Sequence, residues 1–179
     1  MITRRALLLA GIAASSSGLP LYPALAASPA PPSDPLAIVN AIYARVTKGN
    51  GDGGGAFVIE NKAAKAKYLS KSLVKLWAAA DVHTPKGDVG PVDFDPATNS
   101  QEPDVKSFKA EAEKLEASTA VIAVTIVSRT PLLRSADNII RYNFVREGGQ
   151  WKIDDISGSS DGEAWSIRDM LTESLKETA

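Results

Sequence analysis

The segment IRYNFVREGGQWKIDDI at residues 140–156 decides the fold class. Its first half alternates Ile140, Tyr142 and Phe144 with polar side chains, as a half-buried antiparallel strand does. Residues 147–150 read Glu-Gly-Gly-Gln, and glycine takes the backbone angles that tight hairpin turns require. Residues 151–156 then continue as the returning strand. The segment therefore predicts an antiparallel β-hairpin.

The neighbouring segments extend this hairpin. Residues 120–129 are rich in β-branched side chains and predict a further strand. Residues 105–117 are ambiguous, because their Ala, Glu and Lys content favours a helix while their apolar side chains alternate as in a strand. We expect three or four strands in a meander that closes at residues 158–162. A short amphipathic C-terminal helix follows, with Ile167 and Leu171 on its apolar face.

Helices precede the sheet. Asp34 and Pro35 supply an N-cap and a first-turn proline for a helix that ends before Gly49. Residues 62–82 predict two helical pieces, the second capped by Ser70. Residues 49–55 are glycine-rich and predict a mobile connection, and residues 85–103 predict a long loop. The order predicts an α+β fold, with N-terminal helices packed on a curved antiparallel sheet.

The N-terminus predicts a cleavable export signal over residues 1–26. Arg4 and Arg5 precede a short apolar run, and small residues lead to a cleavage site after Ala26. A twin-arginine motif and a general secretory signal are both compatible with this pattern. The run is too short to span a bilayer, and no cysteine is available for a lipid anchor. We expect a periplasmic or secreted protein with a Pro/Ala-rich spacer at 27–33 and a single domain at 34–179.

The composition excludes several kinds of chemistry. The 179 residues include 20 Lys and Arg, 21 Asp and Glu, one His and no Cys. The near-zero net charge disfavours nucleic acid, and the absence of Cys excludes disulfides and thiolate sites. His83 alone cannot build a His-based metal centre. We expect no metal, no cofactor and no membrane span, and a monomer or homodimer that binds a periplasmic protein or a small molecule.

Several short motifs carry a resemblance to a known family. They are Asp34-Pro35 with Tyr43, Tyr68-Leu69-Ser70 with Leu73 and Trp77, Val92-Asp93-Phe94-Asp95-Pro96 with Asn99, Ser100 and Gln101, and the GQWKIDDI segment at 149–156. Together, over about residues 34–175, they resemble the bacterial exported family catalogued as domain of unknown function 3828. The resemblance implies a cystatin-like or nuclear transport factor two-like cone fold and a function that is not characterised.

The densest polar constellation combines Asp93, Asp95, Asn99 and Gln101. Its order is similar to a calcium loop but lacks the later ligands of that loop. A structural loop whose side chains cap backbone amides and a polar rim that binds a ligand are the other interpretations. With Tyr43 and Trp151, these four residues are the candidate ligand or partner contacts. Trp165, near a helix start, is expected to mark a partner surface if it is exposed.

Asp154 and Asp155 are the candidate catalytic residues. Neighbours on a strand alternate between faces, so we expect only one of them to point inward. An inward carboxylate would have a raised pKa and could act as a general base. The simpler alternative is a carboxylate that hydrogen-bonds the backbone.

Three functions remain open. The first is a non-enzymatic exported binding or accessory domain, favoured because no catalytic motif is present. The second is a cone-fold enzyme that uses a strand carboxylate as general base on a small molecule. The third is an inhibitor or immunity-like protein directed against a periplasmic cell-wall enzyme.

Overall fold

The computed structural model describes residues 34–48, 62–101, 105–129 and 135–177. All of them lie within one unit of the chain, Pro31–Ala179. The predicted export signal at 1–26, the spacer at 27–33 and the glycine-rich connection at 49–55 lie outside the described residues.

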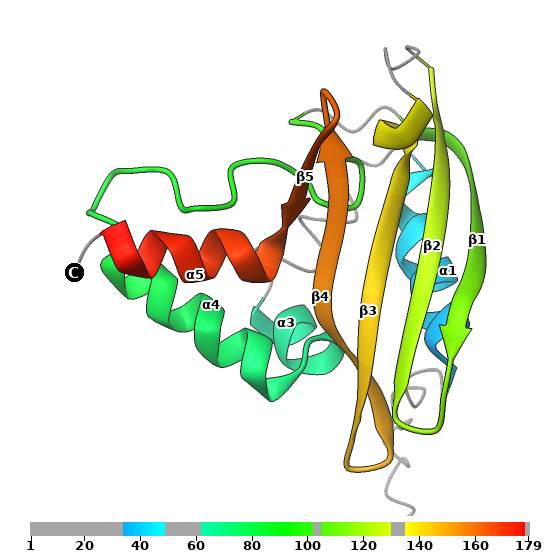
Figure 1. Ribbon diagram of the computed structural model, residues 1–179, viewed down its shortest axis with the longest axis horizontal. Coiled ribbons are helices and arrows are strands. Elements are labelled where there is room, and N and C mark those ends of the chain that lie inside the picture. Colours follow the sequence, from blue (N-terminus) through cyan, green and yellow to red (C-terminus); the bar gives the residue numbers. More distant parts are fainter. Residues whose placement is uncertain (1–33, 49–61, 102–104, 130–134, 178–179) are drawn as a thin grey trace, which may run out of the picture. The chain divides into compact units, whose positions relative to one another are not determined.

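In the described residues, five antiparallel strands form one sheet in which neighbours along the chain are neighbours in space (Figure 1). The strands are β1 Val105–Leu115, β2 Thr119–Ser128, β3 Ile139–Glu147, β4 Gln150–Ser160 and β5 Glu163–Ser166. The meander is thus confirmed, with one strand more than the sequence analysis expected. The fifth strand forms because residues 158–162 do not close the sheet. Instead β4 runs on to Ser160, and Asp161-Gly162 forms the turn of a further hairpin that joins β4 to β5.

The turns that join β3 to β4 and β4 to β5 both contain glycine and have the backbone angles of a tight hairpin. Gly148 and Gly149 have φ values of +57° and +79°, and Asp161 and Gly162 have values of +53° and +85°. Two successive positive φ angles match the right-handed twist of the flanking strands. An Asp-Gly pair is a hairpin signal in its own right, and the sequence analysis missed it at this position.

The ambiguous segment at 105–117 is a strand, β1. Its helix-favouring composition is overridden because the segment pairs with β2 along most of its length. Phe108 and Ala110 pack against the core, while Lys106 and Lys109 are exposed. Alternation of side chains therefore indicates the structure here better than intrinsic propensity does.

Four α-helices occur in the described residues, namely α1 Pro35–Val46, α3 Lys62–Tyr68, α4 Lys71–His83 and α5 Ile167–Glu177. The predicted caps are present. The Asp34 side chain accepts a hydrogen bond from Leu36 N at 3.2 Å, and Ser70 Oγ accepts one from Leu73 N at 2.9 Å. A 3-10 turn, η1 Ser135–Asn138, precedes β3. No helix in the described ranges is long and apolar enough to cross a membrane.

The helices cover one face of the sheet. Helix α1 contacts β1 and β2, and α3, α4 and α5 contact β4 (Figure 1). Their buried side chains join those of the sheet in one core, which includes Ile42, Leu73, Trp77, Ile122, Val124, Tyr142, Phe144, Ile153 and Ile167. The intervening residues of β2 are exposed or half-buried. The predicted α+β arrangement is confirmed.

Candidate functional site

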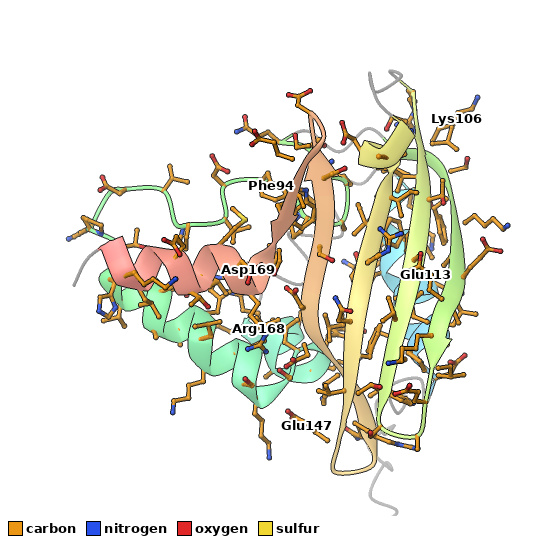
Figure 2. The ribbon with its side chains drawn as sticks, in the orientation of Figure 1. Phe94, Lys106, Glu113, Glu147, Arg168 and Asp169 are labelled. Carbon is orange, nitrogen blue, oxygen red and sulfur yellow. The ribbon has the colours of Figure 1, made fainter. Side chains whose placement is uncertain are left out.

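A pocket of about 670 Å³ opens where the 94–101 loop meets the β4–β5 turn and α5. This volume lies within the range of about 300–1,000 Å³ that is usual for small-molecule sites. Its described lining residues are Phe94, Asn99, Ser100, Gln101, Ser160, Asp161, Glu163, Ala164, Trp165 and Met170. Figure 2 shows Phe94 beside β5. We name this feature the β5 pocket.

The 94–101 loop is shaped by hydrogen bonds of its own. Asp95 Oδ1 accepts a bond from Ala97 N at 2.9 Å, and Asp95 O accepts one from Thr98 N at 3.1 Å. The backbone of Asp95 also pairs with Ser100. Asn99 then takes a φ of +53°, which asparagine tolerates better than most residues do. Asp95 therefore caps backbone amides, as the structural-loop interpretation expected.

The side chain of Asn99 fastens this loop to the sheet. Its Nδ2 donates to Ser159 O at 2.6 Å and to Asp137 O at 3.1 Å. Its Oδ1 accepts a hydrogen bond from Trp165 Nε1 at 2.9 Å. One amide thus joins the loop, η1, β4 and β5, and it fixes the indole ring that lines the pocket.

Trp165 is half-buried and forms the aromatic wall of the β5 pocket. Its ring meets Phe94 edge-on, with centroids 5.0 Å apart and an interplanar angle of 77°. Across the strand pair it lies opposite Gly158, where an added Cβ would come within 2.7 Å of the indole Cζ2. Glycine at 158 is therefore what lets the indole lie close against β4.

Asp137 holds the turn next to the pocket, and the sequence analysis did not single it out. Its carboxylate is buried and accepts bonds from Ser159 Oγ at 2.7 Å and Asp161 N at 3.0 Å, with a longer one from Gly162 N at 3.4 Å. The sequence offered only a polar run before a strand as a signal. The partners of Asp137 come from the β4–β5 turn and become visible only in the folded chain.

The polar groups at the mouth of the pocket face solvent. Gln101, Asp161 and Glu163 are exposed. In the parts of the chain that the structure describes, none of these three side chains forms a hydrogen bond or an ion pair. They are therefore available to a ligand, unlike the amide of Asn99.

The structure separates the six residues proposed as ligand contacts. Asn99 and Gln101 line the β5 pocket, whereas Asp93 and Asp95 do not. Tyr43 is fully buried, and its hydroxyl donates a hydrogen bond of 2.7 Å to Ala97 O. It therefore ties the 94–101 loop to the core and is not a ligand contact. Burial raises the pKa of Tyr43 well above its ordinary value. Trp151 is also in the core, under the Arg146 guanidinium, and lies outside the pocket lining.

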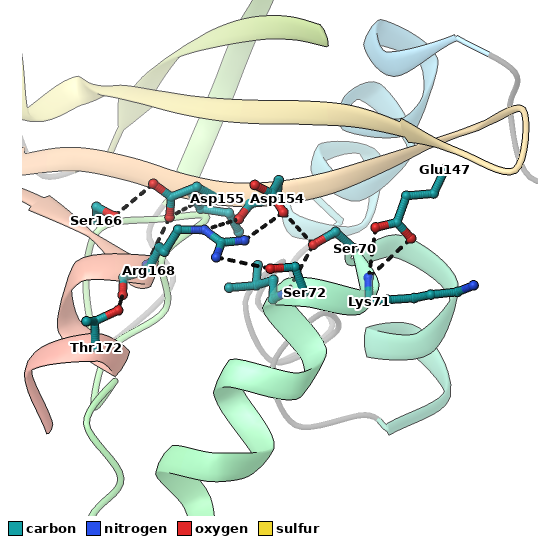
Figure 3. Close-up of polar contacts among 11 residues, drawn as sticks. Ser70, Lys71, Ser72, Glu147, Asp154, Asp155, Ser166, Arg168 and Thr172 are labelled. Carbon is teal, nitrogen blue, oxygen red and sulfur yellow. Dashed lines mark hydrogen bonds and ion pairs between the residues drawn. The ribbon is translucent and has the colours of Figure 1, made fainter. Parts of the chain in front are cut away.

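The candidate catalytic carboxylates do not alternate as predicted. The β3–β4 register shifts so that Asn143 pairs with Asp155 and Phe144 with Ile153, which leaves Asp154 as a bulge residue. Because of this bulge, both carboxylates reach the start of α5 (Figure 3). The expected alternation, with one of the two pointing into the sheet interior, is therefore wrong, because the bulge leaves both half-buried carboxylates between the buried Ile153 and Ile156.

Each of these carboxylates has structural partners. Asp154 Oδ1 accepts from Ser70 Oγ at 2.5 Å and pairs with the Arg168 guanidinium at 2.6 Å. Asp155 accepts from Ser166 Oγ at 2.8 Å and from the backbone amides of Ile156 and Arg168. Burial raises the pKa of Asp155, and those hydrogen bonds partly oppose the rise. The pair ties α4, β4 and α5 together.

No family model, curated protein or solved structure matches the chain. Within the described ranges no group of three or more His, Asp or Glu side chains could hold a metal ion.

Proposed function

We propose that this chain is an exported, non-enzymatic binding domain that holds its ligand in the β5 pocket. The observation that carries the proposal is the contact between Asn99 and Trp165. It fixes an aromatic wall while the polar side chains at the pocket mouth lack described partners. Binding sites typically combine such a preformed apolar wall with a few polar groups that orient the ligand.

The enzyme alternative is supported only by the raised pKa of Asp155. The two carboxylate oxygens of Asp155 already accept three hydrogen bonds. The Asp154 carboxylate accepts hydrogen bonds from Arg168 and Ser70. A general base must lie within hydrogen-bond reach of the proton that it removes, and neither carboxylate is among the described residues that line the β5 pocket. A structural role accounts for both carboxylates more simply, and we therefore favour the binding function.

We further propose that the sheet is the curved sheet of a cone fold, as the resemblance to domain of unknown function 3828 implies. Support comes from the order of helices before a meander and from helices that cover only one face. An experimental structure of the chain would test this directly. A flat sheet would contradict it.

The export part of the proposal depends on residues 1–26. We expect the mature chain to begin at Ala27, which N-terminal sequencing of protein from the cell envelope or medium would show. Changing Arg4 and Arg5 together to lysine blocks export if the twin-arginine route is used and leaves it intact if the general route is used. An uncleaved chain in the cytoplasm would contradict export.

Native mass spectrometry of the chain, purified from its own cells at natural abundance, tests the binding function. We expect a bound mass of roughly a few hundred daltons, the size that a pocket of this volume accepts, or a co-purified protein. Trp165→Ala should lose the bound species. Leu115→Ala, which removes an apolar side chain that is 62% exposed on β1, should retain it. A bare chain in every preparation would contradict the proposal.

A further inference from the structure

Among its described lining residues, the β5 pocket has two acidic side chains and no basic one. Asp161 in the β4–β5 turn and Glu163 at the start of β5 flank Gly162, and both side chains are exposed. None of the described lining residues is basic, and neither carboxylate forms an ion pair with a described residue. Two carboxylates beside an apolar wall attract cations and repel anions.

The aromatic wall favours the same kind of ligand. The Trp165 N–H is already donated to Asn99, so the indole offers its ring rather than a hydrogen bond. Tryptophan is the aromatic residue that attracts a cation most strongly through its ring. Phe94 and Met170 extend this surface and could pack against an alkyl chain.

The side chains that line the pocket favour an organic cation over a metal ion. A hard metal ion such as Ca²⁺ takes about six to eight oxygen ligands, commonly several carboxylates. Within the described residues no group of three or more His, Asp or Glu side chains could hold a metal ion, and this pocket sets its two carboxylates and its Ser, Asn and Gln side chains beside aromatic and thioether groups. Ammonium and guanidinium groups bind both carboxylates and aromatic rings.

We infer that the β5 pocket recognises an organic cation, namely an ammonium or guanidinium group carried on an apolar stem. This inference rests on the proposed binding function and specifies its ligand class. The cationic group binds at Asp161 and Glu163, and the stem packs along Trp165 and Phe94. Such a group can belong to a free diamine or to a basic side chain of a partner polypeptide.

Isothermal titration of the full chain with three linear probes tests the charge requirement. The probes are cadaverine, its uncharged isostere 1,5-pentanediol and the dianion glutarate. The tripeptide acetyl-Gly-Arg-Gly-amide distinguishes a polypeptide source from a free amine. We expect saturable binding of cadaverine or the tripeptide and none of glutarate. Binding should weaken toward about 1 M salt, where the screening length falls to about 3 Å.

Variants that remove the charge of the two pocket carboxylates test whether the cationic probe binds in the β5 pocket. Asp161→Asn and Glu163→Gln keep the size of each side chain, and asparagine tolerates the φ of +53° at 161. We expect each to weaken cationic binding about two- to five-fold and the pair about ten-fold, as the loss of exposed ion pairs does. Asp93→Asn removes an exposed carboxylate outside the pocket lining and should leave binding unchanged.

The outcomes separate this inference from the proposed function. Equal binding of 1,5-pentanediol and cadaverine, unchanged in the double variant but lost in Trp165→Ala, would overturn the cation inference and leave the binding function standing. Failure of both cationic probes to bind would also overturn the inference. The binding function itself is contradicted only if native protein also carries no ligand and no partner.

Discussion

The indole Nε1 of Trp165 donates a hydrogen bond of 2.9 Å to the side-chain Oδ1 of Asn99, 66 residues earlier in the chain. Asn99 in turn donates to backbone oxygens of Asp137 and Ser159. One amide therefore positions the wall of the β5 pocket and holds the loop that also lines it.

Asn99→Gly should loosen this wall. Glycine tolerates the φ of +53° at this position, so the substitution removes three hydrogen bonds without straining the backbone. We expect a loss of about 2–3 kcal/mol in the free energy of unfolding, at roughly 1 kcal/mol per bond. Urea denaturation measures this loss, and Gln101→Ala, at an exposed lining position, should change stability by less than about 0.5 kcal/mol. Equal losses in the two variants would contradict the anchoring role of Asn99.

Gly158→Ala should displace the indole ring. The new Cβ would lie 2.7 Å from the Cζ2 of Trp165, so the ring or β4 must move. We expect a cost of about 1–3 kcal/mol and a changed tryptophan emission spectrum. Gly90→Ala is the matched control, because a Cβ there meets nothing within 4 Å. An unchanged spectrum in Gly158→Ala would show that the indole does not pack on β4 as described.

Tyr43→Phe should destabilise the chain more than Tyr142→Phe. The Tyr43 hydroxyl donates to Ala97 O at 2.7 Å in the core, so its removal leaves a buried acceptor without that bond. We expect a cost of about 1–3 kcal/mol. The Tyr142 hydroxyl makes only a 3.4 Å contact with Tyr43, so its removal should cost less than about 1 kcal/mol. Chemical denaturation of both variants checks the order, and the reverse order would contradict it.

Asp155→Asn should change how stability depends on pH. Burial raises the pKa of Asp155 above its ordinary value of 3.8, so between these two values the folded chain holds more protons than the unfolded chain. The contribution of this carboxyl to stability is thus largest below 3.8 and falls as pH rises through the raised pKa. Asparagine does not titrate.

The unfolding free energy of the wild type minus that of Asp155→Asn should therefore decrease from about pH 3.5 and level off above the raised pKa. Denaturation at a series of pH values measures this difference. Asp93→Asn, at an exposed carboxyl outside the network of Figure 3, serves as the control. A difference that increases with pH would mean that hydrogen bonds from Ser166 and Arg168 outweigh burial.

Local patterns in the sequence were sufficient to predict most of the secondary structure. Asp34 and Ser70 marked helix starts because a cap needs only a short polar side chain and a neighbouring amide. The alternation of residues 140–156 predicted β3 and β4 because side chains on a strand point to opposite faces. These features depend on neighbours along the chain and can be recognised without the fold.

The candidate site was only partly predictable. Asn99 and Gln101 were singled out because short polar side chains cluster in that loop, and both line the β5 pocket. Tyr43 and Trp151 look like binding residues in sequence, but their large apolar area is buried in the core. The sequence also gave no reason to place Asp161 and Glu163 beside Phe94.

By itself, the sequence determined where helices and most strands form, since capping, turn chemistry and side-chain period act over a few residues. Only the tertiary structure decided that residues 105–115 pair as a strand, that a bulge at Asp154 turns two neighbouring carboxylates toward α5, and that Asn99 meets Trp165. These outcomes depend on contacts between residues distant in the chain, and such contacts form when the sheet brings its strands and the 94–101 loop together.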